Sequence, residues 1–255
     1  MSVFHGIDLF GRGFEREGFF VVRAGEIDLG FDVRDLHLPS GKFNGIIAGT
    51  PCQDFSLGNR TGRTFTGYGA EMLKEFERLV LEAQPDWFLL ENVPTVPDIE
   101  IENYKIQRFD LNAKECGLKQ NRLRHFQFGS LTGNILVIDR QPSQTEIEPC
   151  CMATEGTKKN RRPWDKFCEL QGLPRNFDLP LFKQSQKYKV VGNGVPVEMA
   201  RIIARSIRES TWRKQAGRIT VCNCLCGRPI KGRQIYATAA CRKRAQIKRD
   251  RASKF

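Results

Sequence analysis

Long hydrophobic runs are missing from this sequence of 255 residues. Phe19-Phe20-Val21-Val22 is among the longest apolar runs, whereas a membrane-spanning helix needs roughly 18 consecutive apolar residues. The first residues, Met1-Ser2-Val3, lack the basic and apolar regions of a secretory signal peptide. The sequence therefore excludes membrane, collagen-like and secreted disulfide-knot classes, and we expect a cytoplasmic protein.

Acidic residues are scarce at the C-terminal end. Residues 201–255 contain 16 lysines and arginines but only two acids, Glu209 and Asp250, which gives a net charge of +14. The whole chain has a net charge of +12, so residues 1–200 are nearly neutral, at −2. A basic end can be a solvated arm. It also predicts binding to nucleic-acid phosphates, with an affinity that falls steeply as salt rises.

Complete disulfide pairing is excluded because the nine cysteines are an odd number. Four of them lie close together in the chain, at Cys222, Cys224, Cys226 and Cys241. In a cytoplasmic protein this spacing favours a metal site over disulfides. Thiolates suit tetrahedral zinc, which would supply folding energy to a segment with almost no apolar core. The alternative is a partly unfolded segment whose basic residues still bind phosphates.

Short apolar runs alternate with helix-like stretches over the first 130 residues, which predicts an α/β fold built from βαβ units. Apolar spacing predicts a helix over 70–83, and we also expect a short helix over 164–170 and a longer one over 197–213. We expect strands over 6–10, 19–24, 45–48, 87–90, 126–128 and 135–138. Residues 139–163 read as loop, and 190–196 as a tight turn beside a ligand.

Residues able to do chemistry follow three of the predicted strands. Gly11 and Gly13 would let a ligand approach the backbone after the first strand. Cys52 lies in the polar segment Gly49-Thr50-Pro51-Cys52-Gln53-Asp54-Phe55-Ser56, and Glu91 ends the next strand. A thiol at such a sheet edge is a candidate nucleophile. Each feature also has a plainer explanation. The glycines can form an ordinary turn, Cys52 can be a buried cysteine that acts as a small hydrophobic residue, and Glu91 can cap a helix or turn.

Two arginines in Gln120-Asn121-Arg122-Leu123-Arg124 lie on one face if this segment is extended. Taken alone, such a face is usually solvated.

Together and in this order, these segments resemble the cytosine-5 DNA methyltransferase family. The resemblance spans about residues 4–210 and is carried by Asp8 to Gly13, Gly49 to Ser56, Glu91-Asn92-Val93, Gln120 to Arg124 and Gly192-Asn193-Gly194-Val195-Pro196. It implies a Rossmann-like S-adenosylmethionine-dependent methyltransferase fold acting on duplex DNA. It also implies a prokaryotic cell or one infected by a mobile element, in the context of restriction–modification. The oligomeric state is open, with a monomer as the simplest form.

The resemblance implies a role for each candidate catalytic residue. The Cys52 thiolate would add to C6 of a flipped-out cytosine, and Glu91 would hold or protonate N3. Arg122 and Arg124 would orient the ring and stabilise the developing charge. C5 would then accept the methyl group, and loss of the C5 proton would expel the thiolate.

The resemblance also implies which residues bind S-adenosylmethionine. These expected cofactor contacts are Phe10, Gly11 and Gly13 at the methionine part, Glu26 at the ribose, Asp32 with Val33 at the adenine, and Pro51, Asn193 and Val195 in the rest of the pocket.

The sequence departs from the family pattern in three places. The first glycine loop is one residue shorter, and Asp165-Lys166 stands where the family usually carries Arg-Glu. The stretch between Phe126 and Trp164, where the family places its target-recognition region, is short. We therefore expect a catalytic and cofactor-binding domain over 1–129, a short recognition region over 130–185, a returning helix over 186–215 and a basic tail over 216–255.

The tail resembles small zinc-ribbon modules that end in a basic helix, although Ala237 stands where they usually carry a cysteine. Cys222 would then be the fourth ligand. Two alternatives to the DNA enzyme stay open. One is a tRNA cytosine-5 methyltransferase, and the other is a catalytically inactive DNA-binding relative, which the short recognition region favours and the intact Cys52 and Glu91 oppose.

Overall fold

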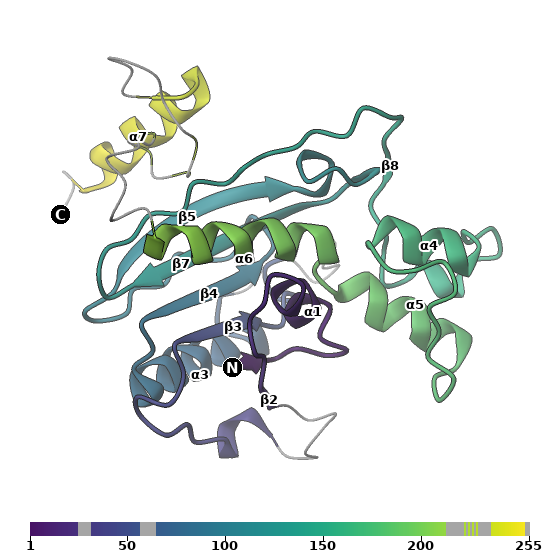
Figure 1. The fold of residues 1–255 in the computed structure, drawn as a ribbon, viewed down its shortest axis with the longest axis horizontal. Helices are drawn as coiled ribbons and strands as arrows, with labels where there is room; N and C mark the ends of the chain where they lie inside the picture. The colour runs from purple at the N-terminus through teal and green to yellow at the C-terminus, as the bar shows by residue number, and fades with distance from the viewer. Residues whose placement is uncertain are drawn as a thin grey trace.

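The computed structural model describes residues 1–24, 32–56, 65–212 and 236–252, together with Cys222, Cys224, Cys226 and Arg228. A six-stranded sheet lies at the centre, with the strand order β2-β1-β3-β4-β7-β5 (Figure 1). Its strands are β1 (Ser2–Val3), β2 (Arg23–Ala24), β3 (Gly45–Gly49), β4 (Trp87–Asn92), β5 (Lys105–Asn112) and β7 (Leu123–Ser130). Strand β7 runs antiparallel to both of its neighbours, β4 and β5, whereas the other pairs of adjacent strands in this sheet are parallel. The sheet is therefore mixed, with β3 and β4 parallel at its centre.

Helices cover both faces of the sheet, as expected for an α/β fold. Helices α1 (Leu9–Glu15) and α6 (Val197–Trp212) pack against each other on one face, and α3 (Tyr68–Ala83) lies on the other (Figure 1). Because both faces are covered, the central strands are apolar nearly throughout. The Rossmann-like α/β prediction is confirmed.

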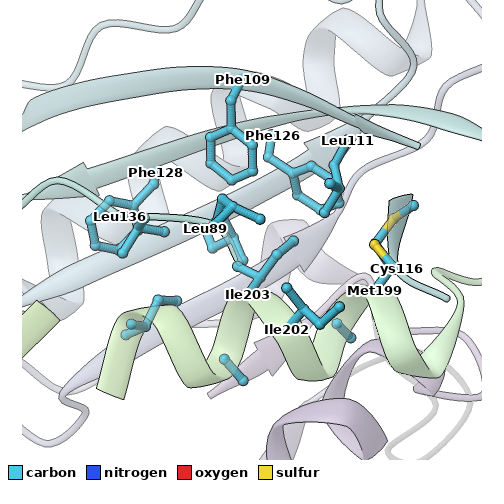
Figure 2. Close-up of a cluster of buried hydrophobic side chains, with 14 of the residues drawn as sticks. Leu89, Phe109, Leu111, Cys116, Phe126, Phe128, Leu136, Met199, Ile202 and Ile203 are labelled. Atoms are coloured by element: carbon cyan, nitrogen blue, oxygen red, sulfur yellow. The ribbon is translucent and has the colours of Figure 1, made fainter. Parts of the chain in front are cut away.

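Alternation of side chains along β3 and β4 divides the core into two layers. Ile46 and Phe88 face α3, whereas Ile47 and Leu89 face α6. Figure 2 shows the α6 layer, where aromatic side chains of β5 and β7 lie opposite Met199 and Ile203. This packing fixes where β3 and β4 end, and these ends carry the reactive side chains.

A smaller part of the chain packs beside the sheet around a separate apolar cluster that contains Phe167, Tyr188 and Cys151. It consists of β6 (Gln120–Asn121), β8 (Glu148–Pro149), α4 (Trp164–Leu170) and α5 (Gln184–Asn193). The remaining elements are the 3-10 turns η1 (Val33–Asp35), η2 (Ala113–Glu115) and η3 (Glu155–Thr157), and the C-terminal helix α7 (Ala239–Ala252).

Several sequence predictions of local structure are confirmed, and others are wrong. The helices over 70–83, 164–170 and 197–213 and the strands over 45–48 and 87–90 are present. The predicted strand over 6–10 is wrong, because a turn leads directly into α1 there. The predicted strand over 135–138 is irregular, and the tight turn at 190–196 is largely the end of α5. Strand β5 was not predicted.

Among the described residues, no helix has the length and apolar character needed to cross a membrane.

Candidate active site

A cavity of about 500 Å³ opens where β3 and β4 end. Its walls come from the segment after β3, the last residues of β4, the turn before α1 and the end of α5. In open α/β sheets, ligands bind beyond the carboxyl ends of the strands. Cys52, Glu91 and Arg124 all line this cavity, so residues far apart in the sequence meet at one place.

The segment that carries Cys52 is held by contacts on both sides. The backbone N–H groups of Phe55 and Ser56 donate to the Cys52 carbonyl at 3.1 and 2.9 Å, which closes a turn. Behind the turn, the side-chain amide of Asn92 donates to the Thr50 carbonyl at 3.1 Å and to its hydroxyl at 2.9 Å. The Phe55 ring is fully buried under the turn. These contacts fix the thiol relative to the end of β4.

Glu91 lies beside the thiol, in a pair with Arg124. Its Oε1 atom is 3.0 Å from Arg124 Nε, and both side chains are largely buried. Burial raises the pKa of Glu91, although Arg124 and Arg122 oppose the rise. Burial also raises the pKa of Cys52, the Glu91 charge adds to the rise, and the two arginines oppose it. Burial therefore raises the pKa of both Glu91 and the Cys52 thiol, and the two arginines oppose both shifts.

Arg122 lies beneath the cavity and is only 1% exposed. Its guanidinium donates to the carbonyls of Cys151, Asn193 and Gly194 at 3.1, 3.2 and 3.0 Å. It also approaches the sulfur of Cys150 at 3.3 Å. Arg122 therefore connects the cavity wall at the end of α5 to the segment before η3. Its positive charge also opposes the rise in the pKa of Cys52.

The expected cofactor contacts divide into two groups. Phe10, Val33, Pro51, Asn193 and Val195 line the cavity. Gly11, Gly13 and Asp32 do not line it, and Glu26 lies outside the described residues.

Gly11 and Gly13 lie inside α1, and the structure gives each a packing reason to be glycine. A Cβ atom on Gly11 would lie 2.0 Å from the Asp8 carboxylate that caps the helix, with its Oδ1 accepting from Gly11 N at 2.8 Å. A Cβ on Gly13 would lie 2.4 Å from the Ala200 Cβ on α6. The expected strand end at these glycines is wrong, because both lie inside α1, and neither lines the cavity.

Asp32 and Glu26 are also not among the lining residues. The Asp32 carboxylate accepts from Arg34 N and Nε, each at 2.9 Å, and this pairing lowers the pKa of Asp32 to about 2. Glu26 lies outside the described residues.

A backbone feature that the sequence did not reveal borders the same cavity. Phe4, Gly6 and Asp8 adopt positive φ angles of 54°, 55° and 51° in the turn between β1 and α1. Two of these are not glycine, and such strained backbone is concentrated at functional sites. A Cβ on Gly6 would meet nothing within 4 Å, so the backbone there is open. The only sequence signal was Gly6 itself.

Comparison with known proteins identifies the family. The family of C-5 cytosine-specific DNA methylases matches residues 25–162 and 154–209, which is most of the chain. The chain belongs to this family.

Bacterial type II methyltransferases are among the similar proteins. The type II methyltransferase M1.HphI of Haemophilus parahaemolyticus is 30% identical over 183 residues, which is 57% of this chain and 49% of that protein. M.FnuDI of Fusobacterium nucleatum is 23% identical, covering 84% of this chain and 95% of the relative. The chain spans about half of M1.HphI and 32% of M.HgiDI from Herpetosiphon aurantiacus.

Solved structures show the same fold at low sequence identity. The Entamoeba histolytica methyltransferase EhMeth has a TM-score of 0.59 and 13% identity, covering 85% of this chain and 98% of that chain. The S. pombe Dnmt2 methyltransferase has a TM-score of 0.56 and 11% identity, with coverages of 85% and 98%. This cytosine methylase family member therefore has the methyltransferase fold.

Gln120 of β6 joins two other segments of the smaller part of this methylase. It is fully buried, its Oε1 accepts from Cys151 N at 3.1 Å, and its Nε2 donates to Gln171 Oε1 at 2.8 Å. The Asp165-Lys166 pair that replaces the usual Arg-Glu forms other bridges: Lys166 pairs with Glu148 at 2.9 Å, and Asp165 with Arg175 at 2.5 Å. These two bridges therefore join segments of the smaller part to one another.

Lys189 on α5 also lines the cavity, and its side chain is exposed. The sequence did not indicate it, because Gly192-Asn193-Gly194 suggested a turn where the structure has a helix.

The four tail cysteines meet, as their spacing predicted. The Sγ atoms of Cys222, Cys224, Cys226 and Cys241 all lie within 4.8 Å of one another, and all four side chains are buried. Ala237 N donates to the Cys222 sulfur at 3.2 Å, and the Thr238 hydroxyl donates to the Cys241 sulfur at 3.1 Å. Donors directed at sulfur stabilise thiolates. The cluster can therefore hold a metal ion.

Proposed function

We propose that this protein is a DNA cytosine-5 methyltransferase that acts through a covalent adduct at Cys52. The observation that carries the proposal is the meeting of Cys52, Glu91 and Arg124 at one cavity beyond β3 and β4. Family membership and the bacterial type II relatives support DNA as the substrate.

The chain's own residues would activate the cytosine ring in two ways. The Cys52 thiolate attacks C6, which makes C5 a nucleophile. Glu91, whose pKa is raised by burial, supplies a proton at N3 and so accepts the electron density that the attack displaces. Arg124, which pairs with Glu91, stabilises the negative charge that develops on the ring. Loss of the C5 proton then expels the thiolate and restores the ring.

S-adenosylmethionine fits the remainder of the cavity. When bound, it supplies the electrophilic methyl group that C5 accepts. Phe10, Val33 and Pro51 offer apolar contacts, and the open backbone at Gly6 admits a polar ligand close to the chain. Asn193 and Val195 border the same space from the end of α5. Val33 lines the cavity and Asp32 does not, so we assign the adenine contact to Val33.

Access to a cytosine inside a duplex requires the base to leave the stack. Residues 130–185 provide the target-recognition region in this proposal, and their small size favours a short recognition site. Lys189, exposed at the cavity rim, is suited to a phosphate of the DNA strand that carries the flipped base.

Zinc is the metal that best suits the cysteine cluster. Four thiolates within 4.8 Å of one another match the tetrahedral Cys₄ sites that zinc prefers. Metal analysis of the purified protein tests this part, with about one zinc per chain expected, and a protein free of zinc after preparation in zinc-containing medium would contradict it.

The central test is transfer of a labelled methyl group from S-adenosylmethionine to duplex DNA, compared with RNA of the same sequence. We expect label at C5 of cytosine in the duplex and none with Cys52→Ala. Transfer to RNA but not to DNA would favour the tRNA enzyme. Binding of the cofactor without transfer to either nucleic acid would favour an inactive relative.

A further inference from the structure

Arg228 links the cysteine cluster to the catalytic part of the chain. Its Nη1 atom lies 3.8 Å from the Cys226 sulfur and 3.7 Å from the Cys241 sulfur. Its Nη2 atom lies 3.8 Å from Glu115 at the end of η2. A site of four thiolates around a divalent cation carries a net negative charge, so a guanidinium beside two of its sulfurs compensates that charge. One side chain therefore contacts both the cluster and the body.

A second arginine makes a similar link. Arg244 on α7 lies 3.6 Å from the Asp110 carboxylate on β5, the edge strand of the sheet. Both acids are also engaged from the body: Asp110 accepts from His125 at 2.7 Å, and Glu115 pairs with Arg140 at 2.5 Å. Contacts within the body therefore hold both carboxylates in place, in addition to their contacts with the tail arginines.

Apolar contact accompanies these pairs. Ala245 on α7 and the four cysteines belong to the same buried cluster as Phe109 of β5 and Ile207 of α6. Figure 1 shows α7 beside the β5 end of the sheet, away from α4 and α5. We use the term C-terminal module for Cys222, Cys224, Cys226, Arg228 and residues 236–252. Its docking face is formed by Arg228, Arg244 and Ala245.

Two cations of α7 lie on the side of the helix that faces away from the docking face. Arg242 and Lys243 are exposed, whereas Cys241 and Ala245, which flank them in the helix, are buried. Within the described part of the chain, the two acids near α7 pair with Arg228 and Arg244, and neither Arg242 nor Lys243 forms an ion pair. Rigidly presented cations on a helix attract the phosphates of nucleic acid.

We propose that the C-terminal module is a second DNA-binding surface, held on β5 and η2 by metal at the four cysteines and by Arg228, and contacting duplex phosphates through Arg242 and Lys243. The inference rests on the proposed DNA substrate and metal. According to this proposal, part of the affinity for DNA comes from a surface outside the cavity. This contribution compensates for the small recognition region.

The experiment measures duplex binding by fluorescence anisotropy over a range of salt concentrations, using the full-length zinc-loaded protein. Each phosphate contact contributes about 0.9 to the slope of log affinity against log salt. Removing two contacts with R242Q/K243Q should therefore lower the slope by about 1.8. The matched control is K42Q/K74Q, which removes two exposed lysines elsewhere on the body and should keep the wild-type slope.

Two further arms test the role of the metal and of Arg228. Chelation of the metal should lower the slope at least as much as R242Q/K243Q. R228Q should lower the slope while zinc content, measured with a colorimetric chelator, stays near that of wild type. If R242Q/K243Q has the same slope as K42Q/K74Q, the proposed DNA-binding surface is overturned. If R242Q/K243Q lowers the slope but chelation or R228Q leaves it unchanged, the surface stands and its metal-dependent docking is overturned.

Failure of the inference is separable from failure of the proposed function. A wild-type protein that methylates duplex DNA, with equal slopes for the two double variants, would refute the second surface alone. A protein that transfers no methyl group but shows the expected slopes would refute the enzymatic proposal alone.

Discussion

Gly13→Ala tests whether the glycine in α1 serves helix packing or the cofactor. The new Cβ would lie 2.4 Å from the Ala200 Cβ, 2.7 Å from the Val197 carbonyl oxygen and 2.8 Å from Arg201 N. Two of these three neighbours are backbone atoms of α6, so α1 and α6 must move apart as units. Overpacking of this kind costs about 1–3 kcal/mol, and the better helix propensity of alanine returns about 1 kcal/mol. Because backbone cannot swing aside, we expect a cost at the upper end of this range and a net loss of about 2 kcal/mol in the free energy of unfolding.

The assay is urea denaturation followed by circular dichroism, together with calorimetric titration of S-adenosylmethionine into the folded variant. The partner variant Ala200→Gly removes the closest contact, so the double variant should recover part of the loss and show a coupling energy in a double-mutant cycle. The cofactor affinity of folded Gly13→Ala should equal that of wild type. A variant with wild-type stability but weakened cofactor binding would refute the packing explanation.

Two further predictions concern the thiol and the buried amide of Gln120. Because burial and the Glu91 charge raise the pKa of Cys52, alkylation of this thiol should be slow at neutral pH and become faster as pH rises. Glu91→Gln should shift the midpoint of this pH dependence to lower pH, and an unchanged or higher midpoint would contradict the electrostatic account. Gln120→Leu leaves Cys151 N buried without its acceptor, so it should lower the free energy of unfolding, measured with urea, by about 2 kcal/mol. Lys119→Ala, at an exposed position, should change it very little, and equal stabilities of the two variants would refute the role of the buried amide.

The segment before α1 shows why local patterns failed in one place. Gly6 to Phe10 is an apolar run of strand length, and the glycines after it imitate a turn. The structure instead places Asp8 at φ 51° as the cap of a helix. An apolar run of this length does not distinguish a buried strand from a buried helix. The capping aspartate two residues after Gly6 was the available signal.

Strand β5 was missed for a related reason. It is the edge strand, with one side covered by α6 and the other largely polar, so Lys105–Asn112 contains no continuous apolar run. Continuous apolar runs identify central parallel strands such as β3 and β4. Strict alternation of polar and apolar residues extends only over 108–112, because Gln107 and Arg108 are consecutive polar residues, and this is too short to identify a strand of eight residues.

The sequence allowed three of the candidate site residues to be grouped together. Cys52, Glu91 and Arg124 were identified from their order and from their places after strands, and they meet at the cavity. Short motifs fix the chemistry at strand ends because the sheet brings those ends together. Contacts that depend on side-chain packing, such as Arg122 on the carbonyls of Asn193 and Gly194, left no local pattern to find.

The most direct test of the central proposal is trapping of the adduct at Cys52. A duplex with 5-fluorocytosine at the target position cannot lose a C5 proton, so the thiolate cannot be expelled after methyl transfer. With S-adenosylmethionine present, we expect a covalent protein–DNA complex whose modified peptide, identified by mass spectrometry, carries the DNA on Cys52, and no complex with Cys52→Ser. Methylation of ordinary duplex DNA by Cys52→Ser at the wild-type rate, or an adduct on a different cysteine, would contradict the proposal.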